Sequence, residues 1–80
     1  MLIPLYGFVK GDTLGVLVLV QDRDSVATLI ASLAQATELR VPVGERARLF
    51  KDGVALDPML TVAEARLSPL ERVDLVPEST

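Results

Sequence analysis

The sequence contains no histidine, cysteine or tryptophan, and only 4% of its residues are aromatic. Without histidine, the chain lacks the side chain that most often serves as a general base near neutral pH and as a transition-metal ligand. Without cysteine, it can form no disulfide bond, no thiolate nucleophile and no cysteine-bound zinc site. We therefore expect no catalytic residue, no cofactor and no metal site, and a role that depends on contact with another molecule.

The chain also lacks an excess of positive charge and any long hydrophobic run. Its 11 acidic residues outnumber its 8 basic ones, and the net charge of -3 opposes binding to a nucleic-acid backbone. The longest apolar run, residues 16–20, is far shorter than the ~20 residues of a membrane-spanning helix. The N-terminus has neither the basic start nor the cleavage site of a secretory signal. We expect a cytoplasmic protein without membrane insertion or nucleic-acid binding.

What the chain does contain is enough apolar material for one folded unit. Of its 80 residues, 50% are apolar and 24% are charged, a composition that argues against intrinsic disorder. No linker or internal repeat divides the sequence, so we expect a single domain over residues 1–80.

The first half of the chain predicts a hairpin followed by a helix. Residues 2–9 are apolar apart from one proline and one glycine, and residues 14–20 form a short segment rich in valine and leucine. A polar turn that contains glycine separates the two segments. Ser25 stands at an N-cap position, and the apolar residues that follow it recur at helical spacing until about residue 37. The Val-Pro-Val-Gly segment at residues 41–44 is incompatible with continuation of the helix.

The second half predicts shorter elements separated by turns. We expect a strand at residues 46–50, a glycine turn and a short strand at 54–56, and a last strand at 72–76 with Val73 and Leu75 pointing into the core. Thr61 and Glu64 have the spacing of a capping box that starts one helical turn. This order predicts an α+β fold, with a mixed sheet of about five strands and one main helix across one face. The first and last strands are expected side by side, in parallel, at its centre.

One set of residues in the second half has a recognisable spacing: Phe50, Lys51-Asp52-Gly53, Leu56, Thr61-Val62, Leu67, Val73 and Leu75. This set resembles the turn, core leucines, capped helical turn and last strand of the ubiquitin-like β-grasp fold. A second set extends over almost the whole chain: Pro4-Leu5, Lys10-Gly11-Asp12, the valine-rich second strand, Asp24-Ser25-Val26, Arg40-Val41, Leu56-Asp57-Pro58-Met59, Thr61-Val62-Ala63-Glu64-Ala65, Leu67, Pro69 and Glu71. It resembles the small B (gamma) subunit of bacterial toluene monooxygenases, whose members are ubiquitin-like.

This resemblance implies a non-catalytic subunit that binds the hydroxylase of a multicomponent diiron monooxygenase acting on aromatic compounds or alkenes. The iron would lie in the large alpha subunit, and the partners would be the larger hydroxylase subunits. The alternative is a free-standing ubiquitin-like interaction module, for example of a bacterial secretion system. Ubiquitin-like conjugation requires a C-terminal Gly-Gly, whereas this sequence ends Pro77-Glu78-Ser79-Thr80.

The strongest functional signal in the residues themselves is an excess of apolar side chains in the hairpin. One helix covers one face of a sheet, yet neither strand of the hairpin alternates with polar residues. We expect Tyr6, Phe8, Leu17 and Leu19 to point away from the helix and to form a partner interface. A slip of one residue would exchange the inward and outward sets but would still leave apolar side chains outside. The alternative is that a loop or the C-terminal tail covers the aromatic pair. Without its partner, the protein is expected to self-associate at high concentration.

Other charged residues have simpler explanations. Asp22 and Asp24 suggest a cation-binding loop, but the spacing and terminal glutamate of an EF-hand are missing, which favours a solvated turn. Glu64, Glu71 and Asp74 could be read as an acid/base pair, but a capping box and surface charges explain them with fewer assumptions. The arginines near the third strand, Arg40, Arg46 and Arg48, are interpreted as a solvated face or an interface rim.

Overall fold

A computed structural model describes residues 1–38 and 46–77 of the chain. The predicted break at residues 41–44 and Arg40 lie outside the described residues. The elements follow the predicted order, and each boundary lies within one residue of the expected one or coincides with it. They are β1 (Leu2–Val9), β2 (Gly15–Gln21), α1 (Val26–Thr37), β3 (Ala47–Lys51), β4 (Val54–Ala55) and β5 (Arg72–Pro77).

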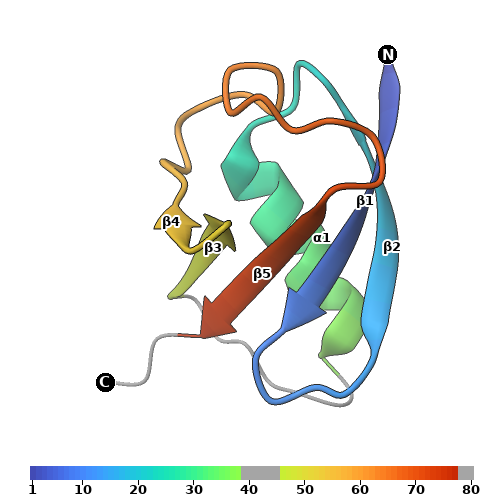
Figure 1. Ribbon diagram of the computed structural model, residues 1–80, viewed down its shortest axis with the longest axis vertical. Coiled ribbons are helices and arrows are strands. Elements are labelled where there is room, and N and C mark those ends of the chain that lie inside the picture. The colour runs from blue at the N-terminus through green and yellow to red at the C-terminus, as the bar shows by residue number, and fades with distance from the viewer. Residues whose placement is uncertain (39–45, 78–80) are drawn as a thin grey trace.

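The strands form a five-stranded mixed sheet in the order β2-β1-β5-β3-β4. Strand β1 pairs antiparallel with β2 and parallel with β5, and β5 pairs antiparallel with β3. Figure 1 shows β1 and β5 side by side in the middle of the sheet, with β2 at one margin. The expected α+β fold and its central parallel pair are therefore confirmed.

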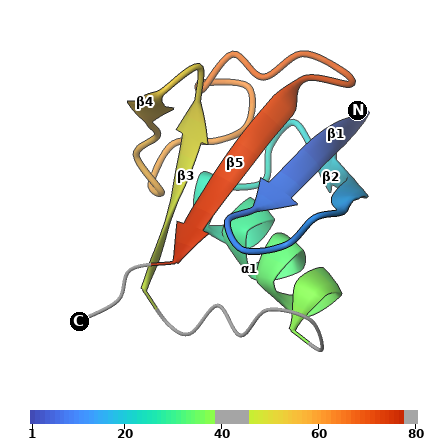
Figure 2. The same ribbon diagram turned by 60° about the horizontal axis from the view of Figure 1, so that its bottom comes forward.

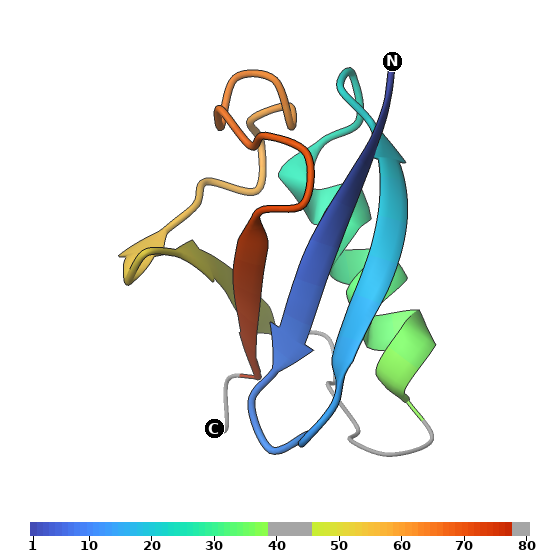
Figure 3. The ribbon, with the colours of Figure 1, turned by 45° about the vertical axis from the view of Figure 1, so that its right-hand side comes forward.

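Helix α1 crosses one side of this sheet (Figures 2 and 3). Ser25 is its N-cap as predicted, because its hydroxyl accepts a hydrogen bond of 3.1 Å from the backbone N–H of Thr28. The helix buries Val26, Leu29, Leu33 and Thr37, and the hydroxyl of Thr37 donates to the carbonyl of Leu33 at 3.0 Å, which satisfies the one buried polar side chain among the described residues.

The core lies between α1 and the sheet. Alternate residues of the strands point into it, as the period of two requires. The segment between β4 and β5 closes one end with Val62 and Leu67, and backbone hydrogen bonds such as Val62 N–H to Asp24 C=O at 2.8 Å attach it to the start of the helix. The buried apolar residues are Ile3, Leu5, Val9, Val18, Val20, Val26, Leu29, Leu33, Leu49, Val62, Leu67, Val73 and Leu75.

The turns follow the predicted chemistry. Asp52 and Gly53 both have positive φ, at 51° and 80°, which suits the two-residue connection of β3 to β4. The capping box is present, since Thr61 N–H donates to Glu64 Oε1 at 2.9 Å and Glu64 N–H donates to Thr61 Oγ1 at 3.0 Å. This segment makes one helical turn and no more, because Arg66 then takes φ of 58°.

Candidate functional site

The orientation predicted for the hairpin is confirmed. Leu5 and Val9 of β1 are buried, and so are Val18 and Val20 of β2. Tyr6 and Phe8 of β1 and Leu17 and Leu19 of β2 alternate with these residues and point to the other side of the sheet, where Tyr6 lies directly opposite Leu17. Leu19 lies opposite Pro4 on the same side. The hairpin therefore presents apolar side chains to both sides, and α1 covers only one of them.

The uncovered side chains form an exposed apolar cluster. Tyr6 is 44% exposed, Leu17 54% and Leu19 59%. Leu2 shares the orientation of Tyr6 because it lies an even number of residues away on the same strand, and it is 51% exposed. We call the cluster of Leu2, Tyr6, Leu17 and Leu19 the outer face. Leu2 was not among the predicted interface residues, although the alternation of residues along β1 indicates it.

Phe8 points outward as predicted, but it is less exposed than Tyr6, Leu17 and Leu19. Its ring packs over Gly15, the residue directly opposite on β2, and a methyl group at Gly15 would lie 2.8 Å from the ring. The guanidinium of Arg72 lies 4.2 Å from the ring centroid, a cation–π contact. Phe8 is thus covered by β2 and β5, and it supports the border of the outer face rather than its centre.

An ion pair marks the limit of the outer face on the β5 side. Arg72 of β5 is the residue paired with Tyr6 of β1, and its guanidinium lies 3.0 Å from Asp74 Oδ1. Charged side chains therefore begin at β5, whereas β1 and β2 carry apolar ones. On the opposite side, the outer face ends at the margin of the sheet.

The aspartates that suggested a cation-binding loop are engaged in local contacts. Asp22 pairs with the N-terminal amine at 3.1 Å, and this hydrogen bond lowers the pKa of its carboxyl below the ordinary value. Asp24 Oδ2 accepts a hydrogen bond of 2.8 Å from the backbone N–H of Gln21. Within residues 1–38 and 46–77, no group of three potential metal ligands comes together. These contacts support the interpretation as a turn.

The other acidic candidates also have structural partners. Glu71 Oε2 lies 2.7 Å from Lys51 Nζ, and this hydrogen bond lowers the pKa of the Glu71 carboxyl. Because Lys51 also donates to the carbonyl of Arg66 at 3.1 Å, it attaches β3 to the segment before β5. With Glu64 in the capping box and Asp74 paired with Arg72, the three carboxylates serve separate structural contacts.

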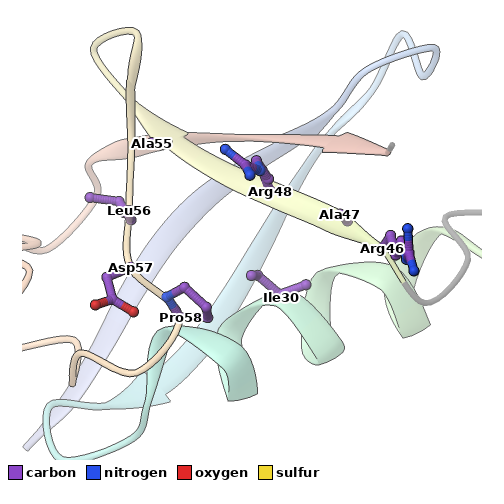
Figure 4. Close-up of a pocket in the computed structure, with 8 residues that line it drawn as sticks. All are labelled: Ile30, Arg46, Ala47, Arg48, Ala55, Leu56, Asp57 and Pro58. Carbon is purple, nitrogen blue, oxygen red and sulfur yellow. The ribbon is translucent and has the colours of Figure 1, made fainter. Parts of the chain in front are cut away.

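A shallow groove separates α1 from β3 and the residues that follow β4 (Figure 4). Its volume is about 510 Å³. Figure 4 shows Ile30 projecting from the helix toward β3, with Arg46 and Arg48 along one side and Asp57 and Pro58 along the other. This groove could not be predicted from the sequence, because its walls come from segments that are distant in the chain.

No helix in the described part of the chain is long and apolar enough to span a membrane.

Comparison with known proteins matches both the fold and the family suggested by the residues. The family model of the toluene-4-monooxygenase system protein B (TmoB) matches residues 2–76. Among curated protein sequences, none matches the chain significantly.

Solved structures agree with this match. A chain of the toluene 4-monooxygenase HD complex with the inhibitor 4-bromobenzoate has a TM-score of 0.87 and 27% identity, over 98% of this chain and 100% of that one. Ubiquitin of Caldiarchaeum subterraneum (TM-score 0.80, 15% identity, 100% of this chain and 98% of that one) shares the fold. So does the ubiquitin-like domain of Plasmodium falciparum Dsk2 (TM-score 0.81, 20% identity, 98% of this chain and 100% of that one). The expected ubiquitin-like fold is confirmed, and because the family model spans nearly the entire sequence, the chain belongs to the toluene-4-monooxygenase system protein B (TmoB) family.

Proposed function

We propose that this chain is the non-catalytic B (gamma) subunit of a bacterial multicomponent monooxygenase of the toluene type, and that it binds the larger hydroxylase subunits in the cytoplasm. The observation that carries this proposal is the family match over residues 2–76. The likeness to a chain of the toluene 4-monooxygenase HD complex, which this chain covers in full, supports it.

We propose further that the outer face is the surface that meets the hydroxylase. Its four side chains are each about half exposed, so they leave on the order of 300 Å² of apolar surface in water, a size associated with interaction sites. At about 25 cal/mol per Å², covering this surface would contribute about 7 kcal/mol before the cost of association. That contribution is large enough to determine whether the subunit stays bound.

Substitution of single residues on the outer face tests this proposal. Leu17→Asp and Leu19→Asp place a charge at exposed positions and leave the core untouched. Phe8 is a poor choice because its ring packs on Gly15. The matched control is Val54→Asp, which introduces the same charge at an exposed valine of β4, at the other margin of the sheet.

The measurement is the dissociation constant for the cognate hydroxylase, together with co-purification from cytosol. We expect both leucine variants to bind at least about 100-fold more weakly, because a carboxylate would be left unpaired in an apolar interface. The control should bind like the wild type. Unchanged binding of both variants would refute the outer face as the interface, and co-purification with a secretion component in place of a hydroxylase would favour the free-standing module.

A further inference from the structure

Strand β2 lies at the margin of the sheet, and the hydrogen bonds made by β1 show which backbone groups of β2 point outward there. Tyr6 N–H donates to the carbonyl of Glu71 at 3.0 Å, and the carbonyl of Pro4 accepts from Leu70 N–H at 2.6 Å. The even-numbered residues of β1 therefore direct their backbone groups toward β5. Because these directions alternate along a strand, the odd-numbered residues of β1 bond to β2.

The same alternation determines which groups of β2 face outward. In the register of the hairpin, the odd-numbered residues of β1 lie opposite Val16, Val18 and Val20. The backbone groups of these three valines therefore form the ladder of hydrogen bonds that joins β2 to β1. The N–H and C=O groups of Leu17 and Leu19 therefore point away from β1, over the margin of the sheet. Figure 1 shows this margin along the right-hand side, and within the described residues no strand lies beyond β2.

One end of this edge is closed and the rest is open. The N–H of Gln21 donates to Asp24 Oδ2 at 2.8 Å, and its carbonyl accepts from Asp24 N–H at 3.0 Å. Asp24 thus occupies the place that another strand would take at Gln21. Between Gly15 and Val20, however, the sequence has no charged residue and no proline, the features that usually protect an edge strand from pairing. The opposite edge strand, β4, is only two residues long.

We propose that an extended segment of the larger hydroxylase subunit pairs with β2 as a sixth strand, through the backbone groups of Leu17 and Leu19. The inference rests on the proposed function and specifies how the partner binds. Leu17 and Leu19 contribute side chains to the outer face and backbone groups to the open edge, so one partner can cover both at once. Residues directly opposite each other share a face of the sheet. The partner segment should therefore carry apolar side chains at two positions separated by one residue.

A second copy of the chain fits this edge less well than a larger partner. Residues 15–19 span about 17 Å of strand. Pairing two copies over that length alone would bury on the order of 400 Å², far below the roughly 1,200 Å² of a stable interface. A larger subunit can add the apolar area of the outer face to the same contact.

Removal of a single edge N–H group tests the proposal. A synthetic chain with N-methyl-Leu17 keeps the leucine side chain and loses only the outward N–H, so the ladder with β1 remains intact. The matched control is N-methyl-Ala55. Leu56 N–H donates to the carbonyl of Leu49 in β3 at 2.8 Å, so the N–H of its neighbour Ala55 points away from β3 at the opposite margin.

We expect N-methyl-Leu17 to bind the hydroxylase about 10- to 100-fold more weakly than the wild type, and N-methyl-Ala55 to bind normally. Normal binding of N-methyl-Leu17, together with weak binding of Leu17→Asp, would overturn strand addition and retain the outer face as the interface. Normal binding of both would reject the interface as well.

Amide hydrogen exchange gives an answer that does not depend on a modified chain. In the free protein, Leu17 and Leu19 should exchange rapidly, whereas Val18 and Val20 are protected by the ladder. Binding of the hydroxylase should slow the amide exchange of Leu17 and Leu19 by at least about 100-fold. Rapid exchange in the complex would refute the proposal, and protection that depends on protein concentration without hydroxylase would assign the edge to a second copy.

Discussion

Gly7 offers the sharpest test of how the hairpin packs against α1. A methyl group added at this position would point toward the helix and lie 2.0 Å from Leu33 Cδ2, 3.0 Å from Cδ1 and 3.1 Å from Cγ. Leu33 is fully buried within the core. Its side chain cannot turn into solvent to make room, so Gly7→Ala must either distort the leucine or push the helix away from β1.

The expected cost follows from two opposing effects. Overpacking a well-packed core costs about 1–3 kcal/mol. Replacement of glycine in a strand recovers about 0.4–1 kcal/mol, because the unfolded chain loses conformational freedom. Gly7→Ala should therefore lower the free energy of unfolding by about 1–2 kcal/mol, and each kcal/mol should lower the melting temperature by about 4–8 °C in a domain of this size.

Urea denaturation of four variants tests this account: Gly7→Ala, Leu33→Ala, their combination, and Gly15→Ala. Gly15→Ala is the matched control, because the atoms that its methyl group approaches belong to the ring of Phe8, which is only partly buried and can move outward. Gly7→Ala combined with Leu33→Ala should be more stable than the sum of the two single effects predicts, by about 1 kcal/mol or more, since the methyl group then fills part of the cavity. If Gly7→Ala is as stable as the wild type, or if the two effects simply add, the packing argument is wrong.

Two further predictions concern a helix cap and an ion pair. Ser25→Ala should lower the free energy of unfolding by about 1 kcal/mol, because Thr28 N–H loses its acceptor. Ser25→Asp retains an acceptor and should lose less stability. Equal losses of stability for the two variants in urea denaturation would contradict the capping role. Lys51 lowers the pKa of Glu71 below its ordinary 4.5, so the stabilisation from the ionised carboxylate is present above that pH and disappears as the pH falls through the folded-state pKa. Glu71→Gln should therefore cost up to about 1 kcal/mol at neutral pH and almost nothing near about pH 2, and a constant difference across pH would refute the linkage.

Much of the fold could be predicted because its signals are local. The strands of the hairpin, the cap at Ser25 and the turn at Asp52 and Gly53 each depend on a few neighbouring residues. The outward orientation of Tyr6 and Leu17 also followed from short-range spacing, since successive residues of a strand alternate between faces.

Other features could not be predicted because they depend on residues distant in the chain. The partial cover of Phe8 comes from Arg72 on β5, and the steric requirement for glycine at position 7 comes from Leu33 on the helix. The groove beside Ile30 likewise combines the helix with residues around β3 and β4. None of these neighbours can be identified from local periodicity.

By itself, the sequence determined which side-chain chemistry the protein can use and that apolar residues occupy both sides of the hairpin. The tertiary structure alone decided how far each outward side chain is exposed, as the cover of Phe8 by Arg72 shows, and which backbone groups of β2 face an open edge. The physical reason is that β1 lies between β2 and β5, and β5 comes from near the opposite end of the chain. The residues of β1 that bond to β5 determine which of its residues bond to β2, and so which backbone groups of β2 remain free to face outward. Only that long-range pairing places the backbone groups of Leu17 and Leu19 at the margin of the sheet.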